Sequence, residues 1–224
     1  MNFLVLEGLD GAGKSTQIKL LTDYLQTKGQ GVKLLHFPRT GSPYYGELVA
    51  RFLRGDLGKI DEVNPYLVAM IYAGDRADSK ILVKQWMDEG YLVVVDRYVY
   101  SNIAFQCAKL KDRAEQTVLK DWIKSFEFEH NKIPKPDVSL FLDVPFTFTE
   151  NKLKNQRTGD DREYLKGKSD IHEADLAFQQ KVRDIYLWQV GEEKDFKLVS
   201  CSDENQDMLA PELIFERIKT TLNI

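Results

Sequence analysis

Short apolar runs alternate with longer amphipathic stretches along most of the chain. Five apolar-rich runs are predicted as strands: residues 2–7, 32–37, 92–95, 138–142 and 196–201. The unbroken apolar run 92–95 is typical of a strand buried on both faces of a sheet. Seven stretches repeat apolar residues at helical spacing: residues 17–28, 47–53, 65–89, 113–128, 146–155, 173–193 and 212–222. Strands that alternate with helices build right-handed βαβ units. The pattern therefore predicts an α/β fold with a five-stranded parallel sheet flanked by helices.

One stretch departs from this alternation. Residues 156–170 are dense in charge and glycine, a composition that buries little apolar surface and predicts a mobile loop. The length of 224 residues and the hydrophobic fraction of 43% suit one globular unit. The chain has no internal repeat and no linker-like segment, so we predict a single domain over residues 1–224.

Charge, hydropathy and cysteine content indicate which classes of binding partner the chain does not suit and where in the cell it is expected. The chain has 31 basic and 35 acidic residues and a net charge of −4, whereas proteins that bind duplex nucleic acid carry a basic excess. No apolar run approaches the ~20 residues of a membrane span, and the first strand leaves no room for a leader peptide. Cys107 and Cys201 form no C-x-x-C pattern, so we expect two reduced thiols, as in a cytosolic protein. We expect a cytoplasmic protein that binds neither nucleic acid nor membranes.

Residues 8–16, GLDGAGKST, match the phosphate-binding pattern G-x-x-x-x-G-K-[ST] between a predicted strand and a predicted helix. Glycines let the backbone N–H groups converge on a polyphosphate, and the start of the helix adds its positive dipole end. Lys14 is expected to reach the β- and γ-phosphates and Ser15 to bind Mg²⁺. The predicted ATP-binding residues are Gly8, Gly11, Ala12, Gly13, Lys14, Ser15 and Thr16.

Charged residues follow another predicted strand. Asp96, Arg97 and Tyr98 come directly after the apolar run 92–95, and ligands of such sheets bind beyond the carboxyl ends of the strands. Asp96 is expected to hold Mg²⁺ through water or to accept a proton, and Arg97 to grip an anionic oxygen. The alternative is a structural ion pair at a strand end.

The chain resembles the thymidylate kinases of the P-loop nucleoside monophosphate kinase family over nearly its whole length. The resemblance rests on six motifs: LEGLDGAGKST (6–16), FPR (37–39), DRA (75–77), DRYVYSNIAFQ (96–106), PKPD (134–137) and the R-x4-R pair Arg157 and Arg162. It implies the P-loop NTPase fold and transfer of the γ-phosphoryl group of ATP to dTMP, with Mg²⁺ as cofactor. It also implies a homodimer, for which the helices over 65–89 and around Trp122 are the candidate surfaces.

The resemblance also implies residue roles at the acceptor. Asp10 takes the place of a carboxylate near the acceptor sugar and the metal, and Glu7 that of a glutamate behind the phosphate loop. Phe37 and Arg39 belong to the segment that clamps the acceptor phosphate, which Arg39 shares with Arg97. We also expect that the Phe37–Pro38 bond is cis.

The base of the acceptor is expected to meet a further set of side chains. By resemblance, Tyr72 takes the place of the aromatic that stacks on the thymine ring. Arg76, four residues on and on the same helix face, takes the place of a residue that approaches a ring carbonyl. Asn102 offers a donor and an acceptor to the pyrimidine edge, and Phe105 crowds the 2′ position of the sugar. The same pocket is lined by Tyr98 and Gln106.

Residues 156–170 resemble the lid of this family. Some members carry an arginine inside the phosphate loop, where this chain has Gly11. The missing charge points to Arg157 and Arg162 as the residues that stabilise the transition state.

Two other interpretations stay open. One is a kinase of deoxynucleosides or of another monophosphate, although Arg39 favours a phosphorylated acceptor. The other is a regulatory P-loop protein that signals to a partner, although the chain has no N-K-x-D guanine motif.

Overall fold

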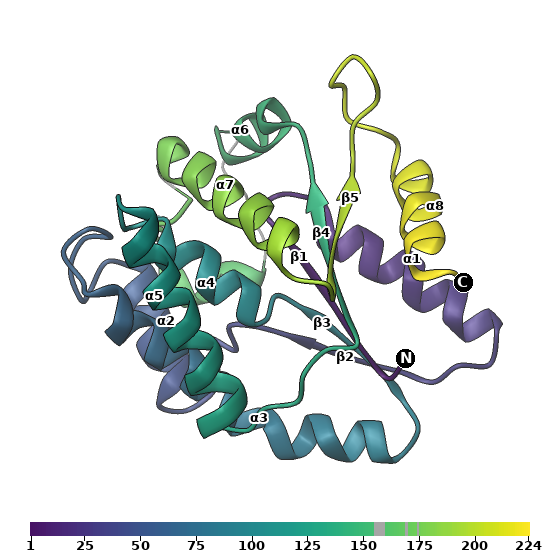
Figure 1. The fold of residues 1–224 in the computed structure, drawn as a ribbon, viewed down its shortest axis with the longest axis horizontal. Coiled ribbons are helices and arrows are strands. Elements are labelled where there is room, and N and C mark those ends of the chain that lie inside the picture. Colours follow the sequence, from purple (N-terminus) through teal and green to yellow (C-terminus); the bar gives the residue numbers. More distant parts are fainter. Residues whose placement is uncertain (155–159, 169, 174) are drawn as a thin grey trace.

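The computed structural model describes residues 1–154, 160–168, 170–173 and 175–224, without the side chains of 151–154 and 160–162. It contains one five-stranded sheet in the order β2-β3-β1-β4-β5, and every neighbouring pair is parallel (Figure 1). The strands are β1 (Phe3–Gly8), β2 (Val32–His36), β3 (Leu92–Asp96), β4 (Val138–Asp143) and β5 (Phe196–Ser200). The α/β fold and the parallel sheet predicted from the hydrophobic pattern are confirmed.

The sheet register brings the predicted chemistry to one edge. Asp96 at the end of β3 is level with Leu6 of β1 and with His36 of β2. The next backbone N–H, that of Arg97, still donates to the Leu6 carbonyl at 2.9 Å. Because parallel strands end at the same edge, the loops after β1, β2 and β3 meet there.

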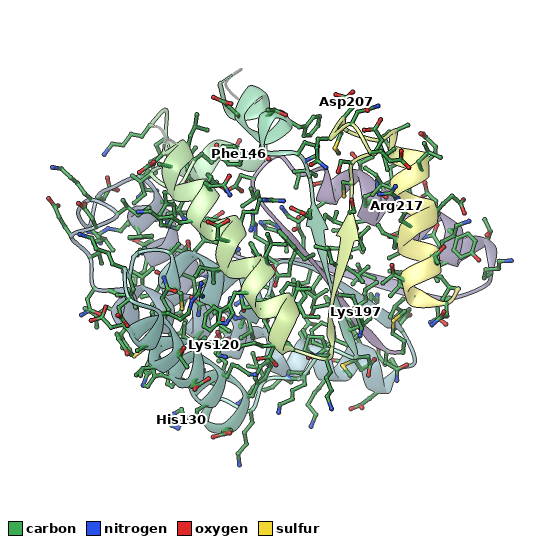
Figure 2. All side chains as sticks on the ribbon, turned by 45° about the horizontal axis from the view of Figure 1, so that its top comes forward. Lys120, His130, Phe146, Lys197, Asp207 and Arg217 are labelled. Atoms are coloured by element: carbon green, nitrogen blue, oxygen red, sulfur yellow. The ribbon has the colours of Figure 1, made fainter. Side chains whose placement is uncertain are left out.

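Helices cover both faces of the sheet (Figure 1). On one face, α1 (Lys14–Thr27) and α8 (Pro211–Leu222) pack on Leu4 and Leu6 of β1. The other face carries α3 (Pro65–Asp88), α4 (Val99–Cys107), α5 (Arg113–Lys124) and α7 (Leu176–Glu192). Phe3 and Val5 belong to that second core, as the two-residue alternation of a strand requires. Polar side chains such as Asp207 and Arg217 lie on the surface (Figure 2).

Helix α4 was not predicted from the sequence. All nine of its residues are buried, including the polar Ser101, Asn102 and Gln106, so it lacks the solvent-exposed polar face that marks an amphipathic helix. The predicted helix 113–128 was also too long as a single regular element, because α5 ends at Lys124 and a π-helical turn, Ser125–His130, follows. The remaining helices, α2 (Tyr45–Leu53) and α6 (Phe146–Lys154), lie where they were expected.

Part of the charged stretch 156–170 is helical. Asp160–Leu165 forms a 3-10 helix, and Leu165 is 4% exposed. Tyr164 packs on the cluster around Val49 and Phe52, and its carbonyl accepts from Arg54 at 2.6 Å. The expectation that this stretch buries little apolar surface is therefore wrong for residues 164–165, because α2 supplies an apolar surface that the local composition does not reveal.

Candidate active site

A cleft of about 1500 Å³ opens at the carboxyl edge of the sheet. It is lined by nearly all of the residues predicted to bind ATP or its acceptor: Asp10, Gly11, Ala12, Gly13, Lys14, Ser15, Thr16, Phe37, Arg39, Tyr72, Arg76, Asp96, Arg97, Tyr98, Asn102, Phe105 and Gln106. Gly8 ends β1 behind the cleft wall. Arg157 lies outside the described residues, and Arg162 lies on the 3-10 helix without a described side chain.

The phosphate loop has the backbone that its glycines permit. Gly11 and Gly13 have φ angles of 77° and 79°, a left-handed conformation that side chains with a Cβ rarely adopt. Gly13 is the N-cap of α1, so the first helical residue is Lys14. The open N–H groups of the first turn of α1 therefore face the loop, as an anion-binding site requires.

Lys14 is folded into this loop. Its Nζ donates to the Leu9 carbonyl at 3.0 Å and lies 3.9 Å from Asp96 Oδ1. Burial lowers the pKa of Lys14 to about 8. Burial alone would raise the pKa of Asp96, but Lys14 and a hydrogen bond from His36 hold that pKa below its usual value. Lysine and aspartate are thus held as a charged pair beside the phosphate loop.

The donor set fits a magnesium ion that is held mainly by phosphates. Oδ1 of Asp96 is buried and has no hydrogen-bond partner within the described ranges. The Ser15 side chain lies in the same cleft. No group of three or more His, Cys, Asp or Glu residues clusters as a metal site in the part of the chain that is described. Mg²⁺ commonly uses one or two protein oxygens together with waters and substrate phosphates, so these residues suit it.

Asp10 and Arg97 connect the phosphate loop with the end of β3. Nη2 of Arg97 donates to Asp10 Oδ1 at 2.8 Å, and Gln179 of α7 donates to Asp10 Oδ2 at 3.3 Å. Arg97 has a φ of 66°, a strained value for a residue with a side chain. Its guanidinium lies 5.3 Å from the centre of the Phe105 ring. Arg97 is thus directed toward the phosphate loop by both its backbone and its partners.

Glu7 holds the start of α4. Its carboxylate is fully buried and accepts from the backbone N–H groups of Tyr98 and Ser101 at 2.9 and 3.2 Å. The hydroxyls of Ser101 and Tyr186 also donate to it. Burial raises the pKa of Glu7 despite these donors. A carboxylate at a helix N-terminus satisfies open N–H groups, so Glu7 fixes α4 against β1.

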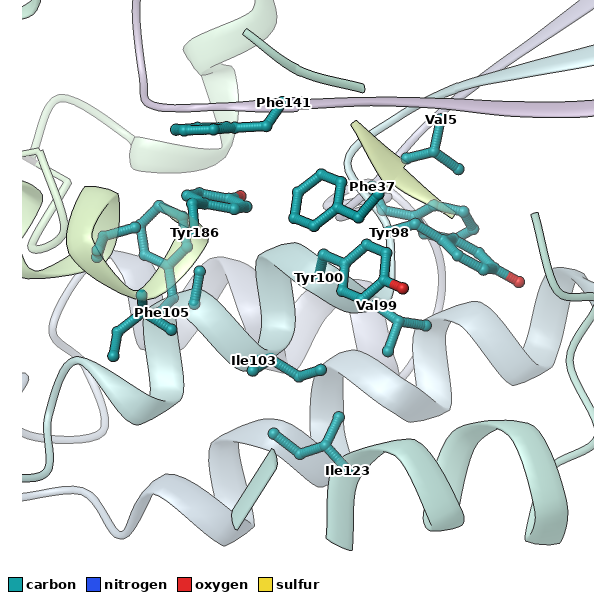
Figure 3. Close-up of a cluster of buried hydrophobic side chains, with 14 of the residues drawn as sticks. Val5, Phe37, Tyr98, Val99, Tyr100, Ile103, Phe105, Ile123, Phe141 and Tyr186 are labelled. Carbon is teal, nitrogen blue, oxygen red and sulfur yellow. The ribbon is translucent and has the colours of Figure 1, made fainter. Parts of the chain in front are cut away.

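Arg39 is positioned by α3. Its backbone N–H and its Nε both donate to the Asp75 carboxylate, at 2.8 and 2.9 Å. Nη2 of Arg39 donates to the Asp75 carbonyl at 2.8 Å and to Asp78 at 3.2 Å. The preceding Phe37–Pro38 bond is cis, as expected. Phe37 packs beside Tyr98 with ring centres 5.8 Å apart (Figure 3).

The far end of the cleft is walled by aromatic and polar side chains. Tyr72, Arg76 and Asn102 line it together with Phe105. Arg76 makes a two-point ion pair with Glu127, at 2.5 and 2.6 Å. A flat ring fits between such aromatic walls, and the polar groups can read its edge.

A profile of the thymidylate kinase family matches residues 6–210. The chain belongs to the thymidylate kinase family. It is 31% identical over 208 residues to a probable thymidylate kinase of Thermococcus kodakarensis, covering 90% of both chains. It is 31% identical over 185 residues to a thymidylate kinase of Mycobacterium tuberculosis, covering 82% and 83%. The fold matches that of a Candida albicans thymidylate kinase with a TM-score of 0.70 at 24% identity, covering 99% of this chain and 92% of the other.

This thymidylate kinase family member also uses residues that sequence reasoning missed. Asp75 and Glu127 hold the cleft arginines, and Gln179 and Tyr186 of α7 support Asp10 and Glu7. Asp75 had a signal, because it directly precedes Arg76 in the DRA motif. Glu127 lies between two phenylalanines, and a single charged residue in such a position is a weaker sign of a role in the site.

Two further walls of the cleft were not predicted. One lies beyond the phosphate loop and is formed by Phe148, Met208, Leu209, Pro211 and Ile214. The other contains Tyr164, Asp170 and His172; Tyr164 and Asp170 belong to the stretch 156–170 that resembles the lid, but neither was named as a site residue. Asp170 accepts from the Tyr164 hydroxyl at 2.9 Å, and burial raises its pKa to about 7, with Asp10 and Glu173 adding to the shift.

The described residues include no helix long and apolar enough to cross a membrane.

Proposed function

We propose that this protein transfers the γ-phosphoryl group of Mg²⁺-bound ATP to dTMP and so forms dTDP and ADP. One observation carries the proposal. The phosphate loop and the polar, aromatic end around Tyr72 line a single cleft, and the Asp10–Arg97 pair lies in that same cleft. Both substrates can therefore bind next to each other in one cleft. Phosphoryl transfer depends mainly on such positioning and on electrostatics.

On the donor side, the loop N–H groups and Lys14 bind the phosphates of ATP. Ser15, Asp96 and Asp10 are the residues that would hold Mg²⁺, with Asp96 acting through water. The metal supplies charge neutralisation at the β- and γ-phosphates when it is bound. The wall around Met208 and Leu209 then receives the base of ATP, because it adjoins the phosphate loop in the same cleft.

On the acceptor side, Arg39 and Arg97 bind the phosphate of dTMP, and Asp10 orients the sugar and the attacking oxygen. Tyr72 stacks on the thymine ring. The base edge is read by Arg76 and Asn102, while Phe105 excludes a 2′-hydroxyl. Aromatic walls with a few converging polar groups are the usual construction of such sites.

Arg157 and Arg162 are proposed to stabilise charge in the transition state. Gly11 stands where some family members have an arginine, so the phosphate loop itself lacks that charge. Closing the stretch 156–170 over the cleft would also exclude water, which would otherwise compete with dTMP for the phosphoryl group.

A panel of acceptors tests the proposed function. ADP release is measured with dTMP, dUMP, dCMP, a purine deoxynucleoside monophosphate and thymidine. We expect dTMP to give the highest kcat/KM. Faster turnover with thymidine would identify a deoxynucleoside kinase, and slow ADP release that no acceptor increases would favour a regulatory nucleotide-binding protein.

A further inference from the structure

Glu127 is a fully buried carboxylate to which the mechanism above assigns no role. It lies on the π-helical turn Ser125–His130 and is 0% exposed. The Nε and Nη2 atoms of Arg76 donate to its two carboxylate oxygens at 2.5 and 2.6 Å. A buried carboxylate is tolerated only when it is paired in this way. Glu127 therefore holds the Arg76 guanidinium in one fixed orientation.

Glu127 also fixes the amide of Asn102. Nδ2 of Asn102 donates to Glu127 Oε1 and to the Ala69 carbonyl, both at 3.0 Å. A carboxylate and a backbone carbonyl can only accept, so the amide nitrogen must face them and the amide oxygen must face away. That oxygen, Oδ1, is buried and has no hydrogen-bond partner elsewhere in the described chain.

Arg76 and Asn102 both line the cleft beside Tyr72. Arg76 has one nitrogen, Nη1, in addition to the two that bind Glu127, and a guanidinium nitrogen can only donate. Asn102 presents an acceptor. A donor next to an acceptor matches the C4 carbonyl and the N3–H of thymine or uracil. Cytosine presents the reverse order, an amino group next to a ring nitrogen without hydrogen.

We propose that Glu127 is a positioning residue that sets this donor–acceptor order. Through it, the base site accepts a pyrimidine with an imide N–H and rejects cytosine. The proposal rests on the proposed function, because it concerns the base of the same acceptor. A site built from fixed polar groups rejects a mismatched ligand strongly, since its buried groups are then left unpaired.

The Glu127→Gln variant tests the proposal, because glutamine presents one donor and one acceptor where the carboxylate presents two acceptors. We measure kcat and KM for dTMP, dUMP and dCMP. The ratio of kcat/KM for dTMP to that for dCMP is expected to fall by at least about tenfold. The KM for dTMP should rise while the KM for ATP stays unchanged. A variant that loses stability or kcat for all acceptors alike, and keeps the ratio, would overturn the proposal.

Two more variants complete the test. Asp143 makes another two-point ion pair, with Arg183 at 2.7 and 2.9 Å, and neither residue lines the cleft. Asp143→Asn removes the carboxylate of this pair. This control should keep the wild-type ratio, and an equal fall in it would overturn the proposal. Glu127→Asp keeps a group that only accepts, but its shorter side chain holds Arg76 and Asn102 less firmly. The ratio should therefore fall, but less far than in the glutamine variant.

If circular dichroism shows that Glu127→Gln does not fold, Glu127→Asp decides the matter. An unchanged ratio in the aspartate variant would then contradict the proposal. Failure of the proposed function has a different signature, because the wild-type protein would then show no ADP release that depends on dTMP.

Discussion

The cationic side chains of the cleft are held by opposite charges within the protein itself. Lys14 lies against Asp96, Arg97 against Asp10 and Arg39 against Asp75. Each cation is thereby kept near the place where a phosphate oxygen is expected. Charges that are fixed in advance need no reorganisation during the reaction, which is the main source of electrostatic catalysis.

Removal of one of these cations should reduce turnover without unfolding the protein. We expect Lys14→Ala and Arg97→Ala each to lower kcat by about 10²–10³-fold, the usual loss for one preorganised group. ADP release with dTMP measures the effect, and circular dichroism checks the fold. Lys197→Ala, on the exposed surface of β5, should leave kcat unchanged. Near-normal kcat in either cleft variant would disprove the assigned role.

Asp170 should make stability depend on pH. Its pKa is raised from an ordinary 3.8 to about 7, so the folded protein binds this proton more tightly than the unfolded chain does. Protonation of Asp170 therefore stabilises the folded state. That contribution is complete below pH 3.8 and is lost as the pH rises through 7. The Asp170→Asn side chain is neutral at every pH. The free energy of unfolding of the variant relative to wild type should therefore increase between pH 4 and pH 8, by on the order of 4 kcal/mol.

Urea denaturation at pH 4, 6 and 8 measures this difference. The amide oxygen introduced by Asp170→Asn still accepts from the backbone N–H of His172, which donates to Asp170 at 2.8 Å. The amide NH2 group can donate to the Tyr164 hydroxyl, which in the wild type donates to Asp170. A difference that is the same at all three pH values would show that Asp170 ionises normally in the folded protein.

Helix α2 is packed closely on the segment that carries Arg39. A Cβ added to Gly46 would lie 2.0 Å from the Arg39 carbonyl oxygen and 2.5 Å from Ser42 Oγ. The first of these atoms belongs to the backbone and cannot rotate away. The position of Arg39 therefore depends on how closely α2 approaches it.

Gly46→Ala should consequently displace Arg39. We expect a loss of about 1–3 kcal/mol in stability, as for other overpacked sites. We also expect a higher KM for dTMP with an unchanged KM for ATP. The matched control is Gly191→Ala on α7, where an added Cβ meets nothing within 4 Å. This control should be neutral or stabilising by about 0.5 kcal/mol. Equal KM values for dTMP in the two variants would show that the packing of α2 does not affect the binding of dTMP.

Helix α3 presents apolar side chains to solvent. Leu67, Met70 and Ile81 are 54%, 42% and 75% exposed, and their spacing places them along one side of the helix. The family resemblance implies a homodimer, and this surface suits one. Light scattering should find a dimer that Ile81→Asp weakens, because a charge would be buried at the interface.

Leu213→Asp on α8 is the control for this experiment, since Leu213 is 54% exposed on another face of the protein. It should leave the dimer intact. A wild-type protein that is monomeric at all concentrations would contradict the dimer. A dimer that neither substitution affects would show that its interface lies elsewhere.

The sheet, most of the helices and the phosphate loop could be predicted from the residues alone, and the resemblance to the family added the residues of the acceptor side. Strand runs such as 92–95 are apolar throughout because both faces of a parallel sheet are buried. The phosphate loop was readable because its geometry needs glycines at fixed intervals, a requirement that is local in the chain. Residues that act through local backbone geometry leave a local signal in the sequence.

The partners that hold the site residues in place could be identified only in the folded protein. Helix α4 has no solvent-exposed face because the sheet and its neighbouring helices enclose it, so no amphipathic pattern marked it in the sequence. Glu7 satisfies N–H groups of residues 98 and 101, and Glu127 pairs with Arg76, 51 positions away. A buried carboxylate needs a partner, yet nothing in its own neighbourhood along the chain names that partner. Folding selects it, because folding alone determines which distant charges are buried together.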